Sequence, residues 1–480
     1  MKGVAAKILN KLTQVDYSDV RVVSRENESI ATKDGVVEAL ESSESLGFGV
    51  RILLKGAWGF AASDDFSKAG IEQTVKKAVE IAQASSLVRN GKVKLDKQKP
   101  IVATYKTPVE IDPFQVSLEE KIKLLLKADR AQRIHKNLKI SQSFMRSFRE
   151  TKNFVSTEGS IIDQAITWCG AGIEATAINK ADLQNRTYPN SFRGQFRTGG
   201  YEMITSLNLV ENAPRIGEEA VKLLTAAQCP SGEFDIILDG NQLGLQIHES
   251  AGHAVEFDRV LGYEASFAGT SFLKPTNLKK LKYGSKHVNI TADATLPAGL
   301  ATFGFDDEGV PAQRTEIVKE GILTGFLTSR ETAGLLKQQS NGTCRADGWG
   351  RIPLIRMTNV NLEPGTWDLD ELIASTKQGI FASTNKSWSI DDRRLNFQFG
   401  TEIAWEIKNG KKKRILKNFT YTGITPQFWA SCDAVCNRNY WTVWGTPNCG
   451  KGQPEQVMFT GHGASPARFR KVKVGIGKWS

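Results

Sequence analysis

The stretch "IHESAGHAVEFD" contains three side chains that bind metal ions or move protons: His248, Glu249 and His253. In the zinc-peptidase signature H-E-x-x-H, two histidines four residues apart share one helix face and reach one Zn²⁺, with the glutamate beside it. Here the histidines are five residues apart, which places them ~140° apart around a regular helix. A shared metal ion therefore requires a local irregularity of the helix.

Ala251 and Gly252 mark the expected position of this irregularity. A π-bulge or a break there would bring both imidazoles to one side, and such bulges occur preferentially at functional sites. We expect Gly252 to favour the deformation, because glycine tolerates unusual backbone dihedral angles. The alternative is a helix with two unrelated histidines. The adjacent Glu249 argues against that alternative, because a general base belongs beside the metal.

Two carboxylates and a third ligand would complete a catalytic metal site. Glu256 and Asp258 follow His253 within about a turn and a half, and we expect them to hydrogen-bond the imidazoles. A catalytic zinc takes three protein ligands and keeps one position open for water. The residues alone leave the third ligand open among His287, His462, Glu256, Asp258 and a C-terminal cysteine.

Six cysteines in 480 residues do not make a disulfide framework, so the expected compartment is the cytoplasm. Cys432 and Cys436 lie close together, but no second cysteine pair accompanies them. Two buried thiols are therefore favoured over a structural zinc site. No run of about 18 apolar residues predicts a membrane span, and Lys7 and Lys11 interrupt any signal-peptide core.

The net charge of +11 arises from 63 Lys and Arg residues against 52 Asp and Glu residues. No basic arm and no basic motif with interleaved aromatic residues accompanies this excess, so nucleic-acid binding is not expected. We interpret the basic runs 277–286 and 408–414 as a solvated loop and a hairpin turn.

The hydrophobic pattern predicts an α+β protein of two halves, each with antiparallel sheets and flanking helices. Alternation with turn residues over 17–62 predicts an antiparallel meander. Amphipathic helices are expected over 65–85, over 117–134 with Ser117 as N-cap, and over 211–227.

The pattern changes near residue 229, where we expect the second half to begin. A buried strand at 234–240 leads into the helix that carries the histidines, with Asn241 as its expected cap. From Val288 onward the chain is strand-rich, with hairpin turns at Gly321 and at Asn409-Gly410. The predicted domains are residues 1–228 and residues 229–480, the second being the metallopeptidase domain.

Taken together, these residues resemble the TldD branch of the TldD/PmbA family, metallopeptidases once called modulators of DNA gyrase. The family motif H-E-x-x-G-H-x-x-E-x-D fits "HESAGHAVEFD" at every fixed position. Four other segments resemble family elements in family order: "GAWGFA" at 56–61, "DDEG" at 306–309, "RIPLIRMTN" at 351–359 and "NCGKGQPEQ" at 448–456. The last of these is one residue shorter than the family's C-G-K-x-G-Q element.

The resemblance implies a zinc ion held by His248, His253 and Cys449, with Glu249 as the base that activates the bound water. Family members assemble as dimers that enclose the active site, so the implied substrates are short or unfolded peptides in extended form. The implied partner is a second copy or a related non-catalytic subunit without the H-E-x-x-x-H motif. This chain carries the motif and would be the catalytic kind.

One segment departs from the family pattern, because "TGHGAS" at 460–465 replaces a glycine-rich G-G-T. We interpret His462 as a surface residue; placed near the metal it would be a transition-state donor. Two other functions stay open. One is a non-enzymatic regulatory subunit that binds a partner protein or a DNA-associated machine, and the other is a zinc amidase acting on modified peptides.

Overall fold

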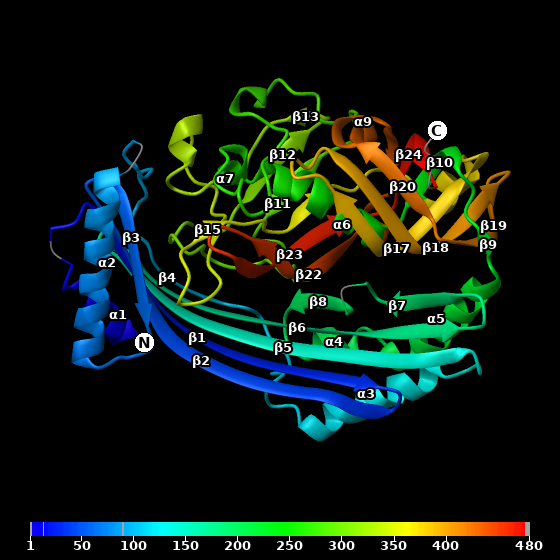
Figure 1. Cartoon of the computed structure of the whole chain (residues 1–480), viewed down its shortest axis with the longest axis horizontal. Coiled ribbons are helices and arrows are strands. Elements are labelled where there is room, and N and C mark those ends of the chain that lie inside the picture. The colour runs from blue at the N-terminus through cyan, green and yellow to red at the C-terminus, as the bar shows by residue number, and fades with distance from the viewer. Residues whose placement is uncertain (1, 13, 89–90, 192, 476–480) are drawn as a thin grey trace.

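The structure, a computed structural model, describes residues 2–475 except 13, 89–90 and 192 (Figure 1). It confirms the α+β class, because two eight-stranded, mostly antiparallel sheets are flanked by helices. The first sheet lies in the first half of the chain, and the second sheet lies in the other half except for its edge strand at 227–228. The division of the chain into domains 1–228 and 229–480 stays a prediction.

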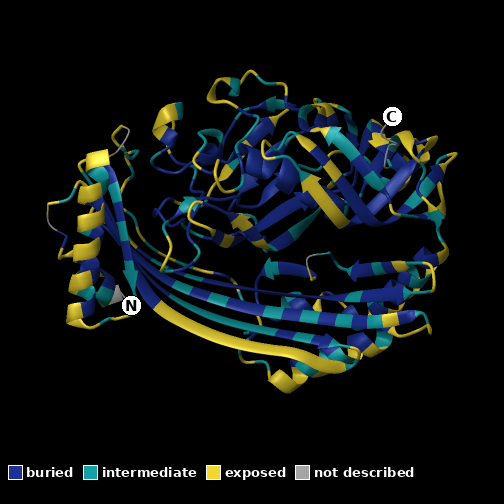
Figure 2. Cartoon of the chain, viewed as in Figure 1, coloured by how far each residue is buried: buried dark blue, intermediate teal, exposed yellow. Residues whose placement is uncertain are grey.

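Long, curved strands build the first sheet (Figure 1). Its strands are β1 (Tyr17–Lys33), β2 (Val36–Leu54), β3 (Ala57–Ser63), β4 (Val102–Lys106), β5 (Leu138–Ser156), β6 (Ile161–Ile178), β7 (Leu183–Tyr188) and β8 (Gln195–Thr198). The order is β3-β2-β1-β5-β6-β4, with β7 and β8 also paired to β6. The antiparallel β1, β2 and β3 confirm the predicted meander. Figure 2 shows that β2 is exposed over 36–46.

Helices cover this sheet where their apolar faces meet it. The described helices of this half are α1 (Lys2–Leu9), α2 (Lys68–Val88), α3 (Leu118–Gln132), α4 (Glu202–Thr205) and α5 (Leu209–Thr225). The Ser117 side chain accepts the N–H of Glu120 at 3.2 Å, which confirms the predicted N-cap of α3. Leu125 of α3 and Ile216 of α5 share one buried cluster with the sheet. No helix among the described residues is long and apolar enough to cross a bilayer.

Shorter strands make up the second half, and the edge strand at 227–228, just before residue 229, joins its main sheet. They are β9 (Ala227–Gln228), β10 (Gly232–Leu238), β11 (Ile290–Asp293), β12 (Arg314–Lys319), β13 (Ile322–Leu323), β14 (Cys344–Arg345), β15 (Leu354–Ile355), β16 (Val360–Leu362), β17 (Gln378–Ile390), β18 (Asn396–Lys408), β19 (Lys411–Lys417), β20 (Thr420–Ile424), β21 (Cys432–Val435), β22 (Thr442–Lys451), β23 (Gln456–Ala464) and β24 (Ala467–Val474). The main sheet runs β17-β10-β24-β20-β18-β19-β9, and β22 pairs with β23 in a separate ribbon. Positive φ angles at Gly321, Asn409 and Gly410 confirm the two predicted hairpin turns.

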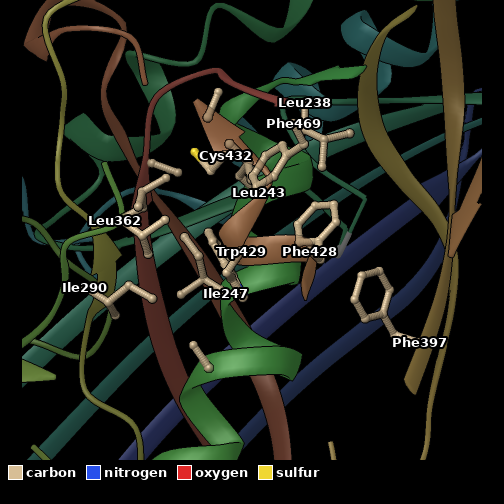
Figure 3. Close-up of a cluster of buried hydrophobic side chains, with 14 of the residues drawn as sticks. Leu238, Leu243, Ile247, Ile290, Leu362, Phe397, Phe428, Trp429, Cys432 and Phe469 are labelled. Atoms are coloured by element: carbon tan, nitrogen blue, oxygen red, sulfur yellow. The ribbon is translucent and has the colours of Figure 1, made fainter. Parts of the chain in front are cut away.

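The helix that carries the histidines is anchored in the core of this half. The helical segments are α6 (Gly240–Ile247), the π-turn His248–Gly252, the 3-10 turn His253–Val255, α7 (Phe257–Val260), α8 (Leu369–Ala374) and α9 (Thr425–Ala430), with 3-10 turns at Pro275–Asn277, Ala333–Leu336 and Arg438–Tyr440. Leu243 and Ile247 of α6 lie in one buried cluster with Trp429 and Phe469 (Figure 3). Burial of each such side chain contributes about 1.5–3 kcal/mol, so α6 is held firmly.

Buried ion pairs connect the first sheet to the second half of the chain. Arg51 on β2 donates to Asp19 on β1 at 2.7 and 2.9 Å, and to Glu308 at 2.9 Å. Lys152 on β5 pairs with Asp307 at 2.6 Å. All five side chains are buried. The "DDEG" segment therefore joins the two halves, because Asp307 and Glu308 each pair with a cation from the first sheet, whereas the buried Asp306 accepts backbone N–H groups.

Replacing Arg51 with Met should lower the free energy of unfolding by about 3–5 kcal/mol, because Asp19 and Glu308 would stay buried without their shared cation. Urea unfolding followed by tryptophan fluorescence measures this change. Lys11→Met is the control, because its ion pair with Glu72 is exposed and should leave the midpoint unchanged. Equal midpoints for Arg51→Met and the wild type would contradict the structural role of the pair.

Candidate metal centre

Strand β10 leads directly into the helix that carries the histidines, as the sequence predicted. The helix begins at Gly240, because the carboxylate of Asp239 accepts the Gly240 N–H at 2.7 Å. The prediction that Asn241 caps the helix is wrong. Asn241 lies inside the first turn, where its amide oxygen accepts the N–H of Thr384 at 3.1 Å. The cap and the paired strand together fix where the helix enters the site.

The predicted irregularity of this helix is a π-turn. Over His248–Gly252 the backbone forms one turn of π-helix, and the N–H of His253 donates to the carbonyl of His248, five residues earlier. The extra residue in the turn brings the two imidazoles to the same side, with ring centroids 4.9 Å apart. The structure therefore confirms that five-residue spacing is accommodated by a local change in helical pitch.

Gly252 is needed for a different reason from the one expected. Its φ of −55° and ψ of −59° are ordinary helical values, so the expectation of unusual dihedral angles is wrong. A Cβ atom at this position would lie 2.0 Å from the Sδ of Met357. Met357 is fully buried. Glycine is therefore required because the π-turn packs directly against this thioether.

Side chains from distant segments hold Ser250 in the middle of the π-turn. The hydroxyl of Tyr283 donates to the Ser250 carbonyl at 2.5 Å, and the indole N–H of Trp429 donates to the Ser250 hydroxyl at 3.0 Å. Tyr283 is fully buried, so the interpretation of 277–286 as a solvated loop is wrong at this residue. Backbone groups in an irregular turn need such partners, because they lose some of the hydrogen bonds of a regular α-helix.

His248, His253 and Cys449 meet at the end of this turn. Each offers one ligand atom, and these atoms all lie within 4.8 Å of one another. The Sγ of Cys449, on β22, lies 3.5 Å from the Nε2 of His253. The three residues are 4%, 5% and 3% exposed. Across the residues that the structure describes, this is the one group of three or more His, Cys, Asp or Glu placed to share a metal ion.

A chain of hydrogen bonds determines which nitrogen of His248 faces the cluster. The Nδ1 of His462 lies 3.1 Å from the Val360 carbonyl, which can only accept, so this nitrogen carries the proton. The Nε2 of His462 then accepts from the Nδ1–H of His248 at 2.8 Å. The Nε2 lone pair of His248 is left free for a metal ion. His462 is fully buried, so its interpretation as a surface residue is wrong.

The second imidazole is oriented by a carboxylate, as the sequence predicted for Glu256. The Oε2 of Glu256 accepts from the Nδ1 of His253 at 2.9 Å, which leaves the Nε2 of His253 free. The same prediction is wrong for Asp258, which pairs with the ammonium of Lys451 at 2.7 Å. Lys451 also lies 3.4 Å from Glu256. This buried lysine compensates both carboxylates, so neither is left as an uncompensated charge.

Burial and neighbouring charges favour the metal-binding forms of His248 and Cys449. Burial lowers the pKa of His248 to about 4, so its imidazole is neutral at pH 7. Burial raises the pKa of the Cys449 thiol, but Arg356 and His253 lower it by more, and the pKa lies below its ordinary value. Arg356 donates to the Cys449 carbonyl at 2.5 Å. Neutral imidazoles and an easily ionised thiol are the forms that bind metal.

One third-ligand candidate, His287, and the cysteine pair lie away from the cluster. His287 is exposed and outside the cluster. Cys432 and Cys436 are buried free thiols, as interpreted, and belong to two different hydrophobic clusters. Burial raises the pKa of each to about 12, so both stay protonated.

Glu249 lies beside the three ligand residues, between the helix and the β17–β18 connection. Its Oε2 forms a 2.5 Å ion pair with Nη1 of Arg394, a contact that the sequence did not indicate. Burial raises the pKa of the Glu249 carboxyl, whereas the two histidines and Arg394 lower it by more in total. The carboxylate is therefore ionised at neutral pH and can accept a proton.

A buried His–His–Cys cluster beside an ionised glutamate is the arrangement of a metal-dependent hydrolase. Comparison with protein families gives the same class. Residues 18–82 match the profile described as PmbA/TldA metallopeptidase domain 1, residues 111–228 match the central domain, and residues 231–475 match the C-terminal domain. The chain belongs to the PmbA/TldD metallopeptidase family, which confirms the resemblance seen in the sequence.

Individual relatives agree with this assignment. A metalloprotease from Methanocaldococcus jannaschii is 34% identical over 89% of this chain and 91% of its own length. A protein named zinc metalloprotease TldD homolog from Saccharolobus solfataricus is 24% identical over 89% of this chain and 90% of its own length.

Solved structures share the fold at low identity. A putative modulator of DNA gyrase from Thermotoga maritima superposes with a TM-score of 0.76 at 17% identity and 96% coverage of both chains. TldE from Thermococcus kodakarensis gives a TM-score of 0.74 at 15% identity and 99% coverage of both chains. These two likenesses concern the fold alone.

The Gly252→Ala variant should bind metal more weakly and melt at a lower temperature, because overpacking of a buried contact costs about 1–3 kcal/mol. Adding Met357→Ala should restore part of the loss by removing the clash. Gly450→Ala is the matched control beside Cys449, since its added methyl group meets nothing within 4 Å. Zinc titration and thermal melts of the four proteins measure the effect. Full metal affinity in Gly252→Ala would refute the packing argument.

Proposed function

We propose that this chain is a zinc-dependent peptidase that hydrolyses short or unfolded peptides. The observation that carries the proposal is the meeting of the His248, His253 and Cys449 ligand atoms within 4.8 Å, next to the carboxylate of Glu249. The name of the relative from Saccharolobus solfataricus supports zinc as the metal. A regulatory subunit without enzymatic activity would need neither the buried cluster nor the glutamate.

The donor set suits Zn²⁺ in an open catalytic site. Zinc binds thiolate sulfur at about 2.3 Å and imidazole nitrogen at about 2.0–2.1 Å, and catalytic sites use three such ligands. His248 and His253 each present a free Nε2 lone pair, and the pKa of Cys449 is lowered. Bound zinc would lower the pKa of its water to about 7 and polarise the peptide carbonyl.

Glu249 is the general base in this proposal. Its ionised carboxylate takes a proton from the attacking water while the water oxygen bonds to the carbonyl carbon. The carbon–nitrogen bond then breaks, and the same proton passes from Glu249 to the leaving amine. Positioning by the capped, core-anchored helix keeps the carboxylate beside the two histidines throughout.

We propose extended peptide segments as substrates. The ligand residues are only 3–5% exposed, so the surface of a folded protein does not reach them, whereas an unfolded segment is thin enough to approach a buried site. If the substrate binds a sheet edge through main-chain hydrogen bonds, which all peptides can form, the enzyme would have only a weak preference for particular sequences. The proposed assembly is a homodimer, or a heterodimer with a related subunit that lacks the H-E-x-x-x-H motif, working in the cytoplasm.

The Glu249→Ala variant should keep one zinc per chain but lose peptide hydrolysis, by about 10²–10⁴-fold for loss of a general base. Cleavage of a pool of unstructured peptides, read by mass spectrometry, measures the loss. Cleavage at the wild-type rate in this variant would contradict the role of Glu249 as general base.

Replacing Cys449 with Ser should abolish stoichiometric zinc binding and chelator-sensitive cleavage together, because the site would lose its thiolate. Cys432→Ser is the matched control, since this buried thiol lies outside the cluster and the variant should keep its zinc. Metal content by atomic emission decides the question. Full zinc content in Cys449→Ser would move the third-ligand role to another residue.

A further inference from the structure

Arg394 lies in the connection between β17 and β18, and its backbone is held in place on both sides. The hydroxyl of Thr425 donates to the Arg394 carbonyl at 2.8 Å, and the N–H of Phe272 donates to the Arg393 carbonyl at 2.8 Å. The φ of Arg394 is +62°, a left-handed conformation that is uncommon for residues other than glycine. Such outliers cluster at functional sites, where the surrounding structure holds them.

The side chain of Arg394 is directed into the metal centre. Its Nη1 contacts the Oε2 of Glu249 at 2.5 Å, and the two side chains are 13% and 9% exposed. The Nε of Arg394 is buried and has no hydrogen-bond partner among the described residues. The guanidinium therefore has donor capacity that the protein itself does not use, beside the proposed base and His248.

The ion pair brings the guanidinium of Arg394 to the group that takes the proton in the proposed reaction. A carboxylate that takes a proton from water must turn a lone pair toward that water. In this structure one carboxylate oxygen of Glu249 is bonded to Arg394. A water that donates to Glu249 is therefore close to this guanidinium, and so is the carbonyl group that the water attacks. An arginine that touches the base, and whose Nε has no partner among the described residues, is therefore placed to donate to the carbonyl oxygen.

We propose that Arg394 is a catalytic residue that donates hydrogen bonds to the oxygen of the scissile carbonyl as this oxygen becomes negative. As the water oxygen bonds to the carbonyl carbon, its proton goes to Glu249 and the carbonyl π electrons move to the oxygen. Arg394 stabilises that charge and keeps its own proton. When the tetrahedral species collapses, the electrons return, the carbon–nitrogen bond breaks and the amine takes the proton. This role rests on the proposed peptidase function.

An alternative role for Arg394 is to bind the C-terminal carboxylate of the substrate. The two roles differ in distance, because a C-terminal carboxylate lies several bonds beyond the reacting carbonyl, whereas Arg394 touches the base itself. They also differ in kinetics. Oxyanion donors act on the transition state and therefore on kcat, whereas a carboxylate anchor acts on ground-state binding and KM as well.

The test compares Arg394→Gln and Arg394→Lys with the wild type on one peptide made with a free and with an amidated C-terminus. We expect Arg394→Gln to lower kcat by about 10²–10³-fold on both peptides, the loss found for a single oxyanion donor, with zinc content and KM nearly unchanged. Arg394→Lys should keep part of kcat, because lysine has the positive charge but lacks the planar guanidinium with its paired N–H donors. Arg393→Gln is the matched control, because Arg393 is adjacent and exposed.

A second measurement needs no turnover. A non-cleavable phosphinic peptide imitates the tetrahedral species. Calorimetry should show that Arg394→Gln raises the Kd of this peptide by about the same factor by which the substitution lowers kcat. The ordinary peptide of the same sequence should bind equally well to the Glu249→Ala variant and to the Glu249→Ala/Arg394→Gln double variant, neither of which cleaves it.

Three results would overturn the role of Arg394: unchanged or increased kcat in Arg394→Gln, a loss seen only with the free-acid peptide, or undiminished phosphinic-peptide binding. The wild type in the same assay tests the proposed function separately. If wild-type cleavage is absent or insensitive to chelators, the peptidase proposal fails and the Arg394 role fails with it. Normal wild-type cleavage with an unimpaired Arg394→Gln variant removes only the role of Arg394.

Discussion

The hydrogen bond from the N–H of His253 to the carbonyl of His248 is the constraint on which the metal centre depends. It forms only in a π-turn, and a regular α-helix would turn the two imidazoles ~140° apart. Ser250, in the middle of the turn, is held by a buried tyrosine and a buried tryptophan. Met357 leaves no room for a side chain at Gly252. Core packing and backbone geometry thus support the same ligand arrangement.

Charge compensation is the second requirement, because buried ions are costly unless they are paired. Lys451 lies two residues after Cys449 and neutralises the carboxylates that surround the histidines. Arg356 lies against the Cys449 carbonyl and favours the thiolate. Arg394 pairs with Glu249. Each anionic group that the proposed chemistry uses therefore has a cation nearby, which allows these groups to stay ionised although they are buried.

The features that depend on local sequence were predictable, and those that depend on tertiary contacts were not. Five-residue spacing is incompatible with a shared ion on a regular helix, so the irregularity followed from geometry. Cys449 was found through family resemblance, because no spacing rule relates residues so far apart. The contact of His462 with His248 exists only because β23 lies beside α6. For the same reason, nothing in the basic run around Tyr283 indicated that this residue is buried beneath the π-turn.

X-ray absorption at the zinc K-edge, recorded on the zinc-loaded full chain, tests the central claim most directly. The arrangement of His248, His253 and Cys449 predicts one sulfur neighbour at about 2.3 Å and nitrogen or oxygen neighbours at about 2.0–2.1 Å, with the multiple-scattering pattern of two imidazoles. A zinc shell without sulfur, or with more than one sulfur, would contradict the account.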